Sequence, residues 1–136
     1  MGNIQCINKI SFEDMKYCID NNEIIISVIP SHDEKCLIKG TINSSNDENK
    51  INDIYKKGEL NKLFIVYGYN SNDNNVAKKY KQLKELGFTN IHIYTGGLFE
   101  WLLLQDIYGF NNFPTTIYEI NHLKYKLYLL ASVWIV

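Results

Sequence analysis

The sequence predicts a single α/β domain whose β-sheet is mainly parallel. Two runs of β-branched and aromatic residues, at 23–29 and 62–67, show almost no alternation between apolar and polar side chains. Such runs are typical of strands that are buried on both faces of a sheet. Segments with helical spacing of apolar residues lie between and after these strands, and this alternation of strands and helices indicates an α/β architecture.

The first half of the chain is predicted to contain a short helix and two strands. Ser11 is a suitable N-cap that is followed three residues later by an acid, and apolar residues then recur at helical spacing over residues 12–20. The strand at 23–29 ends at Pro30, because proline cannot continue a central strand. Residues 36–42 predict a turn and a second, short strand.

A polar loop is predicted at residues 43–50, and a small helix follows it. The second half then repeats the strand–helix order. Its predicted elements are a strand at 62–67, a polar loop at 68–73, a helix up to 86, a strand at 91–94 and a helix at 98–108. Asp73 or Asn74 is expected to cap the first of these helices. Its apolar stripe is expected to contain Val76, Tyr80, Leu83 and Leu86.

These elements divide the chain into three predicted segments. They are a polar N-terminal arm at 1–9, the domain itself at 10–108, and a C-terminal extension at 109–136 whose end is apolar. A chain of 136 residues is long enough for one domain with its own core.

Composition argues against some classes of partner. A net charge of −1 gives no electrostatic attraction to nucleic acid or to an anionic membrane. The three cysteines match neither a zinc-ligand spacing nor a CxxC pair, and an odd number without a secretory signal favours a reducing, cytoplasmic setting. Because the three histidines are far apart in sequence, we expect no metal site and no cofactor; they are His32, His92 and His122.

Four segments, in this order, resemble the rhodanese homology domain. The last segment is the most specific, with a Gly-Phe turn, a strand and then a Gly-Gly pair followed by a tryptophan. The segments are Ile25–Val28, Ile38–Ile42, Ile65–Gly68, and residues 86–91 leading into residues 96–101. The resemblance implies a five-stranded, mainly parallel sheet that is flanked by helices on both faces. It covers residues 10–108.

The resemblance also implies where sulfur chemistry would take place. In active members of the family a cysteine ends the fourth strand, and the loop after it holds the thiolate or persulfide. Here Gly68 stands at the cysteine position, Ser71 where active loops often have glycine, and Asp73 where they often have arginine. This degenerate loop consists of Gly68, Tyr69, Asn70, Ser71, Asn72 and Asp73. Because glycine carries no nucleophile, we expect no catalytic residue in the loop.

The sequence leaves two candidate functions open. The first is a non-enzymatic protein-binding or regulatory module with an unidentified protein partner. The alternative is a sulfurtransferase that uses a different thiol, such as Cys36. The loop itself is open to two interpretations, a recognition surface that uses Tyr69 or a loop that has lost its role.

The two ends of the chain suggest contact with a membrane surface. Gly2 follows the initiator methionine and Cys6 lies close to it, so N-myristoylation and palmitoylation are expected as one alternative to an ordinary Met-Gly start. Residues 125–136 are apolar but too short to span a bilayer. They are expected to pack on the domain, cover a sheet edge, join a partner or touch a membrane, unless they are an artefact of a misread or truncated product.

Overall fold

A parallel sheet forms the centre of the domain. The computed structural model describes residues 8–120 and residue 125. The sheet has five strands in the order β1-β5-β4-β2-β3, and every neighbouring pair is parallel. The strands are β1 (Asn8–Ile10), β2 (Ile24–Ser27), β3 (Thr41–Ile42), β4 (Phe64–Tyr67) and β5 (Ile91–Tyr94). The predicted fold class is therefore confirmed.

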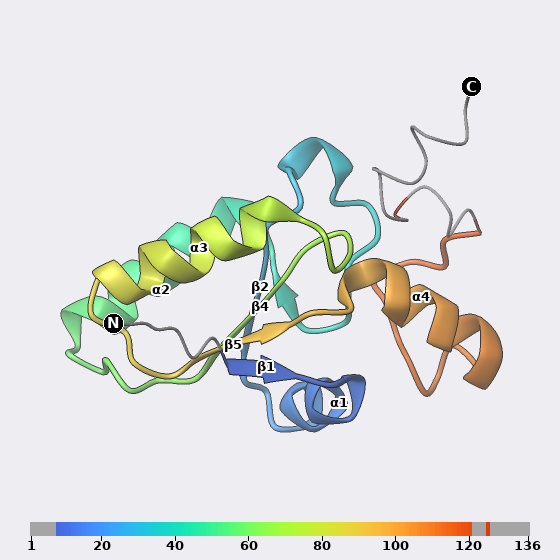
Figure 1. The fold of residues 1–136 in the computed structure, drawn as a ribbon, viewed down its shortest axis with the longest axis horizontal. Coiled ribbons are helices and arrows are strands. Elements are labelled where there is room, and N and C mark those ends of the chain that lie inside the picture. The colour runs from blue at the N-terminus through green and yellow to red at the C-terminus, as the bar shows by residue number, and fades with distance from the viewer. Residues whose placement is uncertain (1–7, 121–124, 126–136) are drawn as a thin grey trace.

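Helices cover both faces of this sheet (Figure 1). On one face lie α2 (Ser44–Lys56) and α3 (Asn74–Glu85), and on the other lie α1 (Phe12–Asp20) and α4 (Gly97–Tyr108). Parallel neighbours need such crossover helices, and the central strands β2 and β4 are consequently buried on both faces.

The core is divided into two halves by the alternation of side chains along the central strands. Ile25 and Ile65 are buried with residues of α1 and α4. Ile26 and Val66 instead point to the opposite face and are buried with residues of α2 and α3. Because both faces are apolar, the strands read as continuous hydrophobic runs in the sequence, as predicted.

Several predicted helix ends are confirmed in atomic detail. The Ser11 hydroxyl accepts a hydrogen bond from the amide of Asp14, whose carboxylate accepts one in return from the amide of Ser11. Asp73 caps α3 by accepting a hydrogen bond from the amide of Asn75. The capping residues therefore set where α1 and α3 begin.

The prediction of a polar loop at 43–50 is wrong. These residues form the first half of α2, which begins at Ser44. The amide and hydroxyl of Ser44 both donate to the Glu34 carboxylate, at 3.0 and 2.8 Å, and this contact fixes the helix start. Only Ile51 and Ile54 of the helix are buried, so its polar residues lie on a solvent-facing side and resemble a loop in the sequence.

Two smaller expectations also need correction. Strand β1 begins at Asn8, inside the segment expected to be a polar arm, and pairs with β5 at the sheet edge. An edge strand tolerates polar residues, so its sequence carries little strand signal. Leu86 is not part of the buried stripe, because it is the C-cap residue of α3 and 42% exposed.

Residues 109–117 fold back onto the domain. The Lys39 amide donates to the Pro114 carbonyl at 3.1 Å, and the Thr116 amide donates to the Leu37 carbonyl at 2.8 Å. From α4, the Trp101 indole also donates to the Pro114 carbonyl. We call residues 109–117 the strap, because they tie α4 to the segment before β3. In the part of the chain that the structure describes, no helix is long and apolar enough to cross a membrane.

We predict that Gln105→Ala strongly destabilises the domain. The Gln105 side chain is buried and donates to the Phe113 carbonyl at 2.8 Å and to the Thr115 hydroxyl at 3.0 Å. Truncation leaves a cavity and removes the donor to two buried acceptors, which costs about 2–4 kcal/mol. Urea unfolding measures the change, and Gln82→Ala on the exposed side of α3 is the matched control, expected within about 0.5 kcal/mol of wild type.

Candidate functional site

The candidate site is the loop at 68–73, which leaves the carboxyl end of β4 and leads into α3. Ligand sites of parallel α/β sheets lie at this edge, where the carboxyl ends of the strands meet the amino ends of the helices. The loop contacts the first turn of α4 (Gly97–Tyr108).

Two loop carbonyls bind the first amides of α4. The amide of Leu98 donates to the Gly68 carbonyl at 3.0 Å, and the amide of Phe99 donates to the Tyr69 carbonyl at 2.8 Å. The first amides of a helix have no partner within the helix and carry partial positive charge. Here they hold the loop in place, so these two amides are already engaged.

Gly97 allows this close approach. Its φ of +68° favours glycine, and a Cβ at this position would lie 2.8 Å from both the Gly68 carbonyl oxygen and the Asn70 nitrogen. Any larger residue would push the loop away from α4. The second glycine of the Gly-Gly pair, which is the first residue of α4, therefore has a packing role.

The carboxylate of Asp73 lies where a side chain at position 68 would begin. One oxygen accepts a hydrogen bond from the Tyr69 amide and the other accepts one from the Asn75 amide, both at 3.0 Å. A Cβ built on Gly68 would fall against the first of these oxygens, and it would lie 2.8 Å from a methyl group of Val76. The space that a side chain at position 68 would enter is thus occupied by the Asp73 carboxylate.

Tyr69 links the loop to two distant segments. Its hydroxyl donates to the Asp33 carboxylate at 2.6 Å, and its ring stacks on the ring of Tyr125 with 5.8 Å between centroids. The side-chain amide of Asn70 donates to the Tyr125 carbonyl at 2.9 Å. Burial, followed by the hydrogen bond and negative charge of Asp33, raises the pKa of Tyr69 well above its ordinary value. Tyr125 itself is 1% exposed and covers the loop.

Tyr67, the last residue of β4, anchors the neighbouring segment. Its buried hydroxyl lies 2.7 Å from the Thr41 hydroxyl and accepts a hydrogen bond from the Ile38 amide at 3.1 Å. Burial raises the pKa of Tyr67 far above the ordinary tyrosine value. The phenol is therefore a structural anchor for residues 38–41.

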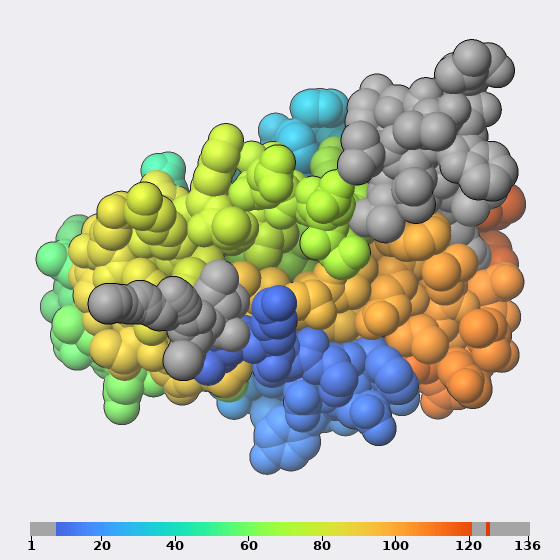
Figure 2. All heavy atoms as spheres, in the orientation of Figure 1, coloured from blue at the N-terminus to red at the C-terminus, as the bar shows by residue number. Residues whose placement is uncertain are grey.

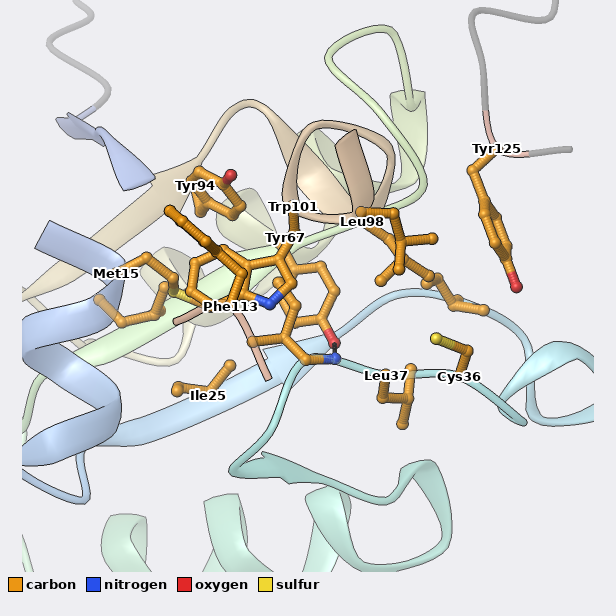
Figure 3. Close-up of a cluster of buried hydrophobic side chains, with 14 of the residues drawn as sticks. Met15, Ile25, Cys36, Leu37, Tyr67, Tyr94, Leu98, Trp101, Phe113 and Tyr125 are labelled. Atoms are coloured by element: carbon orange, nitrogen blue, oxygen red, sulfur yellow. Dashed lines mark hydrogen bonds between the residues drawn. The ribbon is translucent and has the colours of Figure 1, made fainter. Parts of the chain in front are cut away.

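Cys36 lies inside the core, in the same buried cluster as Tyr67 and Leu98 (Figure 3). Its side chain is 0% exposed and is drawn beside Leu37 and near Leu98. The thiol donates to the Ile117 carbonyl at 3.6 Å, so the strap covers it. A reagent can reach this sulfur only if the strap moves.

The sequence analysis identified the loop but not its contacts with Asp33 and Tyr125. Asp33 lies in the 3-10 turn η2 (Ser31–Asp33) that follows β2, and Tyr125 lies in the C-terminal extension. The position of Asp33 could have been inferred, because β2 and β4 are parallel neighbours and their carboxyl ends lie together. Gly2 and Cys6 lie outside the described residues. Within residues 8–120 and 125, no three His, Cys, Asp or Glu side chains are arranged to hold a metal ion.

Comparison with known proteins places this architecture in a family. Residues 11–104 match the family described as rhodanese-like domain. The match covers more than half of the 136 residues, and the chain belongs to this family. No curated protein matches the sequence.

Solved structures share the fold at low sequence identity. The Alr3790 protein from Anabaena sp. matches with a TM-score of 0.55 and 18% identity, over 91% of this chain and 93% of that one. An uncharacterized protein from Saccharomyces cerevisiae matches with a TM-score of 0.54 and 20% identity, over 75% and 96% of the two chains. Thiosulfate sulfurtransferase from Pseudomonas aeruginosa matches with a TM-score of 0.53 and 16% identity, over 72% of this chain and 19% of that one.

We predict that Gly97→Ala unfolds or severely destabilises the domain, whereas Gly58→Ala does not. Both glycines have positive φ, at +68° and +75°, but a Cβ on Gly58 meets nothing within 4 Å. The backbone strain of about 1–2 kcal/mol is common to both variants, so any excess loss in Gly97→Ala comes from the clash with the loop. Thermal unfolding compares the two. Equal losses would contradict the tight contact between the loop and α4.

Proposed function

We propose that this rhodanese-like domain does not transfer sulfur and instead acts as a protein-binding or regulatory module in the cytoplasm. The main support for the proposal is the position of the Asp73 carboxylate. It lies against the place where a side chain on Gly68 would begin. The domain is related to sulfurtransferases, but the loop has neither the nucleophile nor room for one.

Electrostatics supports the same conclusion. Sulfur transfer from thiosulfate would bring an anionic donor to a thiolate, so the loop would have to favour negative charge. Asp73 places a carboxylate there and uses the amides of Tyr69 and Asn75 as its own hydrogen-bond donors. A second anion at this position would be repelled by the carboxylate and would lack these two donors.

Access to the loop is also restricted. Tyr125 stacks on Tyr69, and the hydroxyl of Tyr69 is held by Asp33. A substrate that approaches Gly68 along this side would have to displace the Tyr125 ring. The arrangement favours a loop that takes part in holding the C-terminal extension.

The alternative is catalysis through Cys36. Its sulfur lies in the same buried cluster as Tyr67, close to the carboxyl end of β4. For this function the strap would have to open during each turnover, because the Ile117 carbonyl contacts the thiol.

We further propose contact with a membrane through acylation of Gly2 and Cys6. Two acyl chains anchor a protein firmly, whereas one gives marginal binding. Mass spectrometry of the N-terminal peptide from the native host tests this proposal, and an unmodified peptide would contradict it.

We predict that the purified protein does not transfer sulfur from thiosulfate to cyanide, and that Cys36→Ser is equally inactive. Gly68→Cys is also expected to remain inactive, because its side chain meets Asp73. The double variant Gly68→Cys/Asp73→Ser removes the carboxylate and keeps a side chain that can cap α3. Its thiol should react with a thiol reagent several-fold faster than the thiol of Gly68→Cys.

The control is Gly68→Cys/Asp53→Ser, which removes an exposed acid from α2 instead. The sulfur-transfer assay distinguishes a protein-binding or regulatory module from an enzyme that uses Cys36. Activity in the wild type that is lost in Cys36→Ser would overturn the proposal and establish Cys36 as the nucleophile.

A further inference from the structure

A hollow of about 340 Å³ opens between the 68–73 loop and the first turns of α4. Its lining comes from the loop, from the turn that joins β5 to α4, and from α4 as far as Leu103. Figures 1 and 2 show the loop, in yellow-green, beside the start of the orange α4 helix. We call this feature the loop–α4 hollow. It lies at the carboxyl edge of the sheet, where ligands of parallel α/β folds bind.

Glu100 gives the loop–α4 hollow its charge. It is the only charged side chain among the described residues that line the hollow. One carboxylate oxygen, Oε1, accepts a hydrogen bond from the Tyr94 hydroxyl at 2.5 Å. Within residues 8–120 and 125, no hydrogen bond or ion pair involves the other oxygen. The carboxylate is therefore held in one place and still has an oxygen with which to bind a donor.

The amino end of α4 does not offer its amides to an anion in this hollow. The amides of Leu98 and Phe99 bind two loop carbonyls, and the amide of Glu100 donates to the Gly96 carbonyl at 3.4 Å. The first amides of a helix normally favour negative charge. Because these amides are engaged and a carboxylate lies beside them, the hollow favours a cation instead.

The described lysines around this end of the domain do not neutralise Glu100. Lys78 lines two neighbouring hollows but not this one. Lys16 lies over the Phe113 ring, with its ammonium nitrogen 4.6 Å from the ring centroid. The neighbouring acid, Asp73, has hydrogen bonds to both of its oxygens. Of the acids along this edge, Glu100 is thus the one whose carboxylate faces the hollow with an oxygen to spare.

The remaining lining suits a guanidinium group. The Phe99 ring lines the hollow, and the side chains of Ser71 and Thr95 bring hydroxyl groups to it. A guanidinium is planar, carries five N–H donors, is weakly hydrated and stacks on aromatic rings. It can bind the carboxylate and the hydroxyls while its face lies on the ring.

An apolar row leads from the hollow along the outer side of α4. Phe99, Leu103 and Ile107 follow one another at a spacing of four residues, which places them on one side of the helix. Leu103 is 39% exposed and Ile107 is 69% exposed. Asp106, next to Ile107, is also exposed and adds a second negative charge. A segment with an arginine and apolar side chains is complementary to this surface.

We propose that the loop–α4 hollow binds an arginine side chain of a partner protein, whose neighbouring apolar residues lie along the outer side of α4. The inference gives a chemistry to the partner of the proposed protein-binding module, and it rests on that function. Its test measures peptide binding and the sulfur-transfer assay measures catalysis, so the failure of each is a separate result.

Titration of the full chain with short blocked peptides, followed by the backbone amide signals in NMR spectra, tests the proposal. A peptide with one arginine and several leucines should shift the amide signals of Ser71, Thr95 and Gly96 and reach saturation. Replacing its arginine by citrulline keeps the shape of the side chain and removes the charge. The citrulline peptide should bind several-fold more weakly, because it loses the charge-assisted contact with Glu100.

Variants of the protein locate the contact. Glu100→Gln keeps an oxygen that accepts from the Tyr94 hydroxyl, and it should weaken binding of the arginine peptide several-fold. Phe99→Leu keeps an apolar side chain, removes the ring face and should also weaken binding. Asp53→Asn removes an exposed acid from α2 and should bind as the wild type does.

Two results would overturn the inference. Equal binding of the arginine and citrulline peptides to the wild-type chain would show that the hollow does not recognise a cation, and this comparison needs no variant. Equal binding of the arginine peptide and a peptide with glycines in place of its leucines would assign the hollow to a free guanidinium compound and not to a partner protein.

Discussion

The contact between the 68–73 loop and the amino end of α4 is the constraint on which the candidate site depends. Two loop carbonyls bind the amides of Leu98 and Phe99 in the first turn of α4, and the missing side chain of Gly97 allows the backbones to meet. This contact fixes the loop over the carboxyl edge of the sheet. The loop then positions Asp73 against Gly68 and Tyr69 against Asp33 and Tyr125.

Gly68 and Asp73 are best understood as a pair. A cysteine at position 68 and the observed carboxylate cannot occupy the same space, and the carboxylate uses amides that would otherwise stabilise a bound anion. The loop amides therefore already have an anionic hydrogen-bond partner, because the chain itself supplies the negative charge through Asp73. A side chain added at position 68 alone would therefore meet the Asp73 carboxylate.

Much of the fold could be predicted from the sequence because burial on both faces leaves a strong signal. The runs before Ser27 and Tyr67 read as buried strands, and Ser11 and Asp73 mark helix starts through local hydrogen bonds. Edge strand β1 and the polar first half of α2 were missed, because neither buries a continuous apolar stripe. The loop was found from a family resemblance. The position of Asp33 follows from the parallel pairing of β2 and β4, whereas the contact of Tyr125 arises from tertiary packing that local patterns do not encode.

The pairing of Gly68 with Asp73 is tested most directly by a double-mutant cycle on the free energy of unfolding, with Gly68→Ala, Asp73→Ser and the double variant. The Cβ of Gly68→Ala clashes with the Asp73 carboxylate, and the Asp73→Ser background removes that carboxylate. The cost of Gly68→Ala should therefore fall by about 1–3 kcal/mol in the Asp73→Ser background. Losses that add within about 0.5 kcal/mol would contradict the account, because they would show that Asp73 does not occupy the place of the missing side chain.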